Sequence, residues 1–191
     1  MPRKRVAILI SGRGSNMAAL IAAAAAPDYP AEIALVVADR PDAAGLGRAS
    51  EAGVPTLVVD YAALKKKAIA EAELDRSLAE ARVDIVCLAG FMRILSPGFV
   101  ERWHDRIINI HPSLLPAFPG LDTHSRALAA GVSQHGCTVH FVSPEVDGGP
   151  IIAQAKVPVS PGDTDEVLAA RVLAQEHRLY PQALAAVARK L

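Results

Sequence analysis

Short apolar runs, rich in valine and isoleucine, alternate with alanine-rich stretches over the first 110 residues. β-Branched runs bounded by turn residues predict strands, while the stretches between them have the composition and spacing of helices. We expect strands at 6–10, 33–38, 56–59, 84–88 and 107–110. We expect helices at 16–26, 43–52 and 62–81, the last with an apolar side made by Leu64, Ile69, Leu74 and Leu78. Such alternation predicts a parallel sheet covered by helices.

The pattern changes after residue 110, where three prolines and a glycine fall within twelve residues. We expect an ordered loop at 111–122, followed by a short helix at 125–130. Two strands should follow at 138–142 and 151–157, and a last helix at 164–191. The link between the two strands is too short for a helical crossover, so they should be antiparallel. Pro181 should interrupt the last helix.

These elements predict one α/β domain over 1–191. Its sheet should be Rossmann-like: open, twisted and mostly parallel, with helices on both faces and an antiparallel strand pair toward the C-terminus. The chain is long enough to bury a core without disulfide or metal staples. Cys87 and Cys137 both lie in apolar runs, which indicates buried, reduced thiols.

Charge and hydropathy give no support for a nucleic-acid binder, a membrane protein or a secreted protein. Lysine and arginine total 20, as do aspartate and glutamate, so nothing favours a general nucleic-acid or membrane-surface binder. No apolar run reaches membrane-spanning length. Basic residues precede the run at 6–10, but that run is short and leads into a glycine turn. It therefore predicts a strand rather than a signal peptide, and we expect a cytoplasmic protein.

A glycine-containing segment, Ser-Gly-Arg-Gly-Ser-Asn at 11–16, joins the first strand to the first helix. Glycines allow a tight turn and a close ligand, and the helix N-terminus offers free N–H groups to an anion. A dinucleotide fingerprint would need a third glycine where Met17 stands, and a P-loop would need Gly-Lys-Ser/Thr. We favour a monophosphate site in which Ser15 or Asn16 caps the helix or binds the anion. The alternative is a plain strand-to-helix turn.

Asn109 and His111 follow at the carboxyl end of the fifth strand, where open α/β sheets bind ligands. Being two residues apart in an extended segment, they should point the same way. Asp147 lies in an Asp-Gly turn between the last two strands. Singly, each could be an ordinary loop or turn residue. Together they supply an amide donor, an imidazole and a carboxylate, the groups needed to stabilise an oxyanion and move a proton.

Two other kinds of site are less well supported by this half of the chain. A hydrolase triad lacks its Gly-x-Ser-x-Gly elbow, and Ser113 is too close in sequence to His111. The histidines at 111, 124, 135 and 140 match no helical His-x-x-x-His pair, so no metal site is expected.

Five segments occur in the order found in one known family. They are Ile-Ser-Gly-Arg-Gly-Ser-Asn at 10–16, Leu-Ala-Gly-Phe-Met-Arg-Ile-Leu at 88–95, Asn-Ile-His-Pro-Ser-Leu-Leu-Pro at 109–116, Val-Asp-Gly-Gly-Pro at 146–150 and Gln-Glu-His at 175–177. From Val6 to about Pro181 the chain resembles the phosphoribosylglycinamide formyltransferase family, the folate-dependent formyltransferases of purine synthesis.

The resemblance implies a formyl transfer from 10-formyltetrahydrofolate, as co-substrate and without a metal, to the amine of glycinamide ribonucleotide. The implied catalytic residues are Asn109, His111 and Asp147. The implied ribonucleotide contacts are Arg13, Gly14, Ser15 and Asn16 at the phosphate and Glu176 at the glycinamide end. The implied folate contacts are Lys67, Met92, Arg93, Ile94, Leu95, Asn109 and Ser143. Lys67 stands where the family often has arginine, and the resemblance also suggests a cis bond at Leu115–Pro116.

The implied partners are these small molecules only, with no nucleic acid or membrane, in a monomer or weak homodimer. Methionyl-tRNA formyltransferases share the catalytic set but carry a further C-terminal domain, and nothing follows the last helix here. Formyltetrahydrofolate deformylases usually carry an N-terminal regulatory domain, whereas this chain starts at the first strand. A non-catalytic nucleotide-binding module remains the alternative from another class, although it would leave Asn109, His111 and Asp147 without a purpose.

Overall fold

A computed structural model describes residues 2–191. Seven strands in this part of the chain form one sheet, in the order β3-β2-β1-β4-β5-β6-β7. The strands are β1 (Lys4–Ile10), β2 (Ala31–Ala38), β3 (Thr56–Val58), β4 (Ile85–Leu88), β5 (Ile107–His111), β6 (Gln134–Phe141) and β7 (Ile151–Pro158). The first five are parallel, and β6 runs antiparallel to both β5 and β7. The predicted fold class is confirmed, including the antiparallel strand pair.

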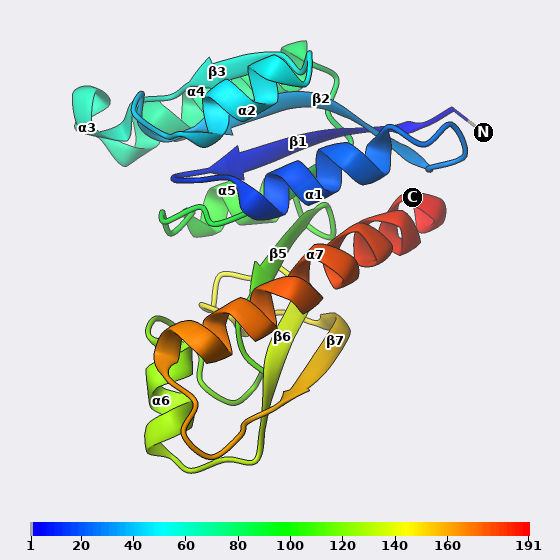
Figure 1. Ribbon diagram of the computed structural model, residues 1–191. Helices are drawn as coiled ribbons and strands as arrows, with labels where there is room; N and C mark the ends of the chain where they lie inside the picture. Colours follow the sequence, from blue (N-terminus) through cyan, green and yellow to red (C-terminus); the bar gives the residue numbers. More distant parts are fainter. Residues whose placement is uncertain (1) are drawn as a thin grey trace.

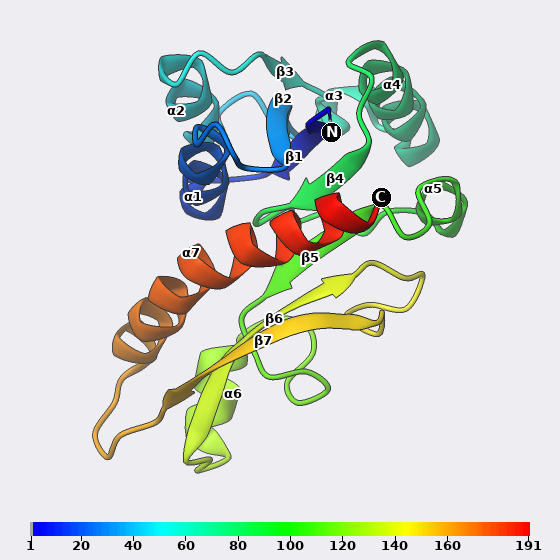
Figure 2. The ribbon, with the colours of Figure 1, turned by 90° about the vertical axis from the view of Figure 1, so that its right-hand side faces the viewer.

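Helices cover both faces of the sheet. They are α1 (Ser15–Ala24), α2 (Gly45–Glu51), α3 (Tyr61–Leu64), α4 (Lys67–Glu80), α5 (Pro97–Arg102), α6 (Thr123–Ala129) and α7 (Asp165–Lys190). Figure 2 shows α1 and α2 on one side of β1 and β2, and α4 and α5 on the other. Strand β1 is buried on both faces because its alternate residues enter two cores: Val6, Ile8 and Ile10 face one, Ala7 and Leu9 the other.

The single helix expected over 62–81 is wrong, because the chain forms two helices there. Asp60 Oδ1 accepts hydrogen bonds from the N–H groups that begin α3, and Lys65 then takes a left-handed conformation (φ 57°) that ends it. Helix α4 buries Ala70, Leu74 and Leu78, which share one face because they are four residues apart. Ile69, expected on the buried side, is 48% exposed.

The expected interruption at Pro181 is also wrong. Helix α7 continues through the proline and crosses the sheet as one element (Figure 1). A proline inside a helix costs about 3 kcal/mol, since it removes a hydrogen bond and crowds the preceding turn. Buried residues on both sides of it, such as Val172, Tyr180 and Leu184, pack into one core and hold the two halves on a common axis. The Tyr29 hydroxyl also donates to the Pro181 carbonyl, over 2.6 Å.

The remaining predictions about the core agree with the structure. Cys87 and Cys137 are free and fully buried, and burial raises the pKa of each thiol to about 12. The Leu115–Pro116 bond is cis. Within residues 2–191, no helix combines the length and the apolar character needed to cross a bilayer.

Candidate active site

The carboxyl ends of β4 and β5 open onto a cavity of about 1110 Å³, which also reaches α6, α7 and the β6–β7 connection. Its position agrees with the rule that open α/β sheets bind ligands beyond the carboxyl ends of their strands. Exposed apolar side chains line its mouth, among them Met92 and Ile94, which are 67% and 68% exposed, and Leu121. A cavity with an apolar rim and polar groups inside is typical of a small-molecule site.

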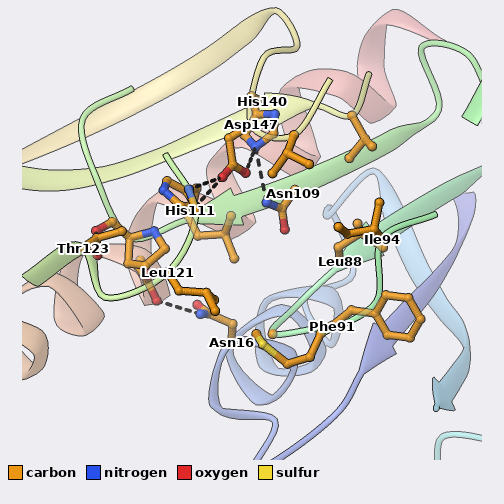
Figure 3. A pocket seen from close by; sticks show the side chains of 18 of the residues that line it. Asn16, Leu88, Phe91, Ile94, Asn109, His111, Leu121, Thr123, His140 and Asp147 are labelled. Atoms are coloured by element: carbon orange, nitrogen blue, oxygen red, sulfur yellow. Dashed lines mark hydrogen bonds and ion pairs between the residues drawn. The ribbon is translucent and has the colours of Figure 1, made fainter. Parts of the chain in front are cut away.

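Four polar side chains converge at one end of the cavity (Figure 3). Asn109 and His111 lie on β5 with the two-residue spacing that puts both on one face. Asp147, at a left-handed position (φ 54°) in the turn before β7, places Oδ2 at 3.4 Å from Nδ1 of His111. Its Oδ1 lies 3.6 Å from Nε2 of His140 on β6. The structure thus brings Asn109, His111 and Asp147 together and adds His140, which the sequence interpretation did not assign to this set.

The Asp147 carboxylate is surrounded by groups that stabilise its ionised form. Burial alone would raise its pKa, but the N–H of Gly120, which donates to Oδ2 over 2.8 Å, lowers it. The charge of His111 acts in the same direction, and the net result is a pKa below the ordinary aspartate value. Asp147 therefore carries a negative charge at neutral pH.

His111 has an acceptor at each ring nitrogen. Nε2 lies 3.0 Å from the Phe118 carbonyl oxygen, and Nδ1 faces Asp147. A carbonyl oxygen can only accept, so Nε2 carries a proton, and the carboxylate at Nδ1 favours a second one. The buried imidazole of His111 is therefore held between two acceptors, one at each ring nitrogen.

The predicted phosphate loop lies at another part of the same cavity, which Arg13 and Asn16 line. Helix α1 begins at Ser15, and Gly14, in a left-handed conformation (φ 69°), is the residue before it. No side chain caps the helix, so of the two roles expected for Ser15 or Asn16 capping is excluded and anion binding stays a prediction. The first-turn N–H groups have no partner within the helix and can bind an anion. Gly14 and Ser15 are not among the side chains that line the cavity and would contribute through the backbone.

Glu176 joins α7 to this loop. Asn16 Nδ2 donates to Glu176 Oε2 over 2.7 Å, and Glu176 is a buried residue of the cavity wall. Burial raises the Glu176 pKa, partly offset by the Asn16 hydrogen bond. Asn16 Oδ1 is buried without a hydrogen-bond partner among residues 2–191, which leaves an acceptor at this end of the cavity. Asn16 and Glu176 thus form a polar pair beside the helix N-terminus.

The residues predicted to line a folate slot come from the segment after β4 and from the β6–β7 connection. Met92, Arg93, Ile94, Leu95 and Ser143 all line the cavity. The segment is anchored, since Met92 N–H donates to Ser11 Oγ over 2.8 Å and Arg93 Nε donates to buried Asp39 over 2.5 Å. Its end is held by Glu71, which accepts the Ser96 N–H over 2.6 Å. The slot is therefore built on fixed backbone.

Lys67 is the predicted site residue that the structure places elsewhere. It is the first residue of α4, it is exposed, and it is not among the residues that line the cavity. The break at Lys65, rather than one continuous helix, sets its position.

Two further histidines lie close to this site. His124 Nδ1 is 3.1 Å from His135 Nε2, and burial, followed by the charges of His124 and His111, lowers the His135 pKa to about 4. Among residues 2–191 there is no group of three or more His, Cys, Asp or Glu side chains arranged to hold a metal ion.

Comparison with known proteins identifies the family. The formyl transferase family model matches residues 4–184. The phosphoribosylglycinamide formyltransferase of Escherichia coli (strain K12) is 47% identical over 176 residues, which cover 92% of this chain and 83% of that protein. A crystal structure of phosphoribosylglycinamide formyltransferase from Brucella melitensis superimposes with a TM-score of 0.94 at 55% identity, covering 97% of this chain and 96% of that one.

A third relative is much longer than this chain. The trifunctional purine biosynthetic protein adenosine-3 of Drosophila pseudoobscura pseudoobscura is 51% identical over 189 residues, which are 98% of this chain but 14% of that protein. This chain therefore corresponds to one segment of the trifunctional relative. From the family match and the similarity over nearly its full length, the chain belongs to the formyl transferase family and, within it, to the phosphoribosylglycinamide formyltransferases.

Proposed function

We propose that this protein transfers the formyl group of 10-formyltetrahydrofolate to the glycinamide amine of 5-phosphoribosylglycinamide. The products are formylglycinamide ribonucleotide and tetrahydrofolate, and the reaction belongs to de novo purine biosynthesis. One observation carries the proposal: a single cavity joins a helix N-terminus suited to a phosphate with the Asn109, His111 and Asp147 cluster. The names of the relatives support the same reaction.

Each substrate has a matching part of the cavity. The ribonucleotide phosphate binds at the start of α1, with Arg13 supplying a cation and the backbone of Gly14, Ser15 and Asn16 supplying N–H groups. Glu176, bonded to Asn16, contacts the rest of the ribonucleotide. The folate ring system enters the slot lined by Met92, Arg93, Ile94, Leu95 and Ser143.

The glycinamide amine and the formyl group then meet at the Asn109, His111 and Asp147 cluster. The amine nitrogen attacks the formyl carbon, a C–N bond forms, and the carbonyl electrons move onto oxygen. His111 and the Asn109 amide donate to this oxyanion, while Asp147 holds the imidazolium through Nδ1. The N–H now accepted by Phe118 is the one available to the substrate oxygen, because Asp147 holds the other.

The intermediate collapses when the bond from carbon to the folate N10 breaks. The attacking amine loses a proton, and N10 gains one, through water or the cluster itself. No covalent enzyme intermediate is needed, and the side-by-side binding of both substrates supplies the proximity.

We further propose that the enzyme acts in the cytoplasm on small molecules alone, as a monomer or weak homodimer. The apolar run at 6–10 belongs to strand β1, which lies inside the sheet between β2 and β4. Cell fractionation and analytical ultracentrifugation test these two points.

Acceptor dependence tests the reaction. The protein is mixed with 10-formyltetrahydrofolate, with and without glycinamide ribonucleotide, and tetrahydrofolate is followed by absorbance. The proposal requires tetrahydrofolate to appear only with the ribonucleotide and in equal amount to formylated ribonucleotide. Formate released without the ribonucleotide would instead indicate a deformylase, and no turnover would point to a non-catalytic binding module.

A further inference from the structure

His140 contacts the side-chain amide of Asn109, one of the three proposed catalytic residues. Asn109 on β5 and His140 on β6 are direct partners across the antiparallel ladder. Asn109 Nδ2 lies 3.2 Å from His140 Nε2, and His140 is 2% exposed. In Figure 3 the amide nitrogen of Asn109 faces His140 and its oxygen points away. Either Asn109 Nδ2 or His140 Nε2 can carry the proton that lies between them.

The contact of the other ring nitrogen, Nδ1, decides the tautomer of His140. Nδ1 lies 2.9 Å from the carbonyl oxygen of Phe141, which can only accept a hydrogen bond, so Nδ1 carries a proton. That carbonyl packs closely against Gly149: a Cβ added there would lie 1.8 Å from the Phe141 oxygen, so only glycine fits. The β6–β7 ladder is irregular at Val139/His140, a feature that often re-aims a side chain beside an active site.

A neutral imidazole with its proton on Nδ1 has an acceptor at Nε2. The Asn109 amide nitrogen then donates one N–H to His140. The competing neighbour is Asp147 Oδ1, which would require a proton on Nε2, but it lies at 3.6 Å, outside hydrogen-bond distance. His111 differs, because both its ring nitrogens face acceptors. The Asp147 carboxylate thus faces both imidazoles, while His140 directs its Nε2 lone pair at the Asn109 amide.

We infer that His140 is a positioning residue: as the neutral Nδ1–H tautomer, it accepts from Asn109 and fixes the orientation of the amide. The second N–H of Asn109 Nδ2 then remains for the substrate oxygen. Without His140 the amide can rotate and present its carbonyl oxygen at that position, which would repel an oxyanion rather than stabilise it. This inference rests on the proposed formyl transfer for its effect on rate, although the tautomer itself does not depend on it.

A double-mutant cycle separates positioning from a general structural role. His140→Phe should lower kcat by roughly tenfold or more, approaching the about 10²–10³ of a lost oxyanion donor, with little change in KM. In an Asn109→Ala background the same change should alter kcat by less than about twofold, because the amide it positions is gone. His140→Gln, which offers an acceptor oxygen near the Nε2 position, should recover part of the rate. Equal losses in both backgrounds, or no loss from His140→Phe, would overturn the inference.

The tautomer is measured without turnover. In the ¹⁵N-labelled wild-type protein, long-range ¹H–¹⁵N spectra should show His140 with a protonated Nδ1 and an unprotonated Nε2 at neutral pH. A proton on Nε2 would overturn the inference even if the variants fail to fold. If wild-type protein shows no formyl transfer but has the expected tautomer, the proposed function fails and the positioning geometry stands.

Discussion

Gly14 allows a quantitative test of the phosphate loop, using Gly14→Ala. Its φ of 69° lies in the left-handed region, where a residue with a Cβ loses roughly 1–2 kcal/mol. The added Cβ would also lie 2.9 Å from Met17 Cε and 3.1 Å from Gly45 Cα. The methionine end can move, but the Gly45 backbone cannot move without shifting α2. Both effects act where the N–H groups of α1 would bind the phosphate.

These terms predict a destabilisation of about 1–2 kcal/mol. For a protein of this size 1 kcal/mol lowers Tm by about 2–4 °C, so Gly14→Ala should lower Tm by roughly 2–8 °C in a thermal-shift assay. Calorimetry should show the affinity for glycinamide ribonucleotide falling by about tenfold or more, equivalent to about 1.4 kcal/mol, because the anion-binding N–H groups move.

The matched control for stability is Gly12→Ala in the same loop. Gly12 has no atom within 4 Å of an added Cβ, and its φ lies outside the left-handed region. The control should leave Tm unchanged or raise it slightly, since alanine lowers the entropy of the unfolded chain. Equal Tm shifts for the two variants would refute the conformational reasoning, and unaltered ribonucleotide affinity for Gly14→Ala would refute the site.

Three further predictions concern the cluster and the ribonucleotide end. His111→Ala should reduce turnover well beyond tenfold, a barrier change of about 1.4 kcal/mol, while calorimetry still shows ribonucleotide binding; a smaller loss would remove its role. Asp147→Asn should lower kcat by about tenfold or more with little change in the affinity for the ribonucleotide, because His111 loses the carboxylate that holds its Nδ1; an unchanged kcat would contradict this role. Burial raises the Glu176 pKa, so the stability that this group contributes is present at low pH and lost as pH rises through that pKa. Glu176→Gln can still accept a hydrogen bond from Asn16, so it should raise Tm above the wild-type value more at about pH 8 than at about pH 5, and it should weaken ribonucleotide binding. A variant Tm below the wild-type Tm at about pH 8 would contradict this reasoning.

The sheet could be predicted from the sequence because each strand is a short β-branched run and each connection has the length of a helix or a turn. Strand β4 is the clearest case: Ile85 to Leu88 are all buried, as a central parallel strand requires. Helix α5 was not predicted, although Ser96 before Pro97 is an N-terminal signal. The structure shows Ser96 Oγ accepting from the Phe99 N–H, over 3.2 Å.

Two helix predictions failed, for different reasons. Nothing local to Pro181 shows that residues on both sides of it share one core, so the proline signal was overestimated. Nothing local to Lys65 indicates a left-handed residue, since lysine has no preference for that conformation. At Pro181 tertiary contacts decide what local propensity cannot.

The candidate site divides in the same way. Asn109 and His111 were predictable because two-residue spacing at a strand end fixes their common direction. Their neighbour His140 was not, because its place opposite Asn109 depends on the register between β5 and β6, which apolar alternation does not give to single-residue precision. Lys67 was placed by resemblance alone, and its surroundings depend on where α4 begins.

The central claim is direct formyl transfer at the Asn109, His111 and Asp147 cluster. The most direct measurement is a single turnover with 10-formyltetrahydrofolate labelled with ¹³C in the formyl group, followed by NMR in wild-type and His111→Ala protein. We expect the wild-type protein to move all of the label into the formyl amide of the ribonucleotide, and His111→Ala to do so far more slowly. Label released as formate, or transfer by His111→Ala at the wild-type rate, would contradict it.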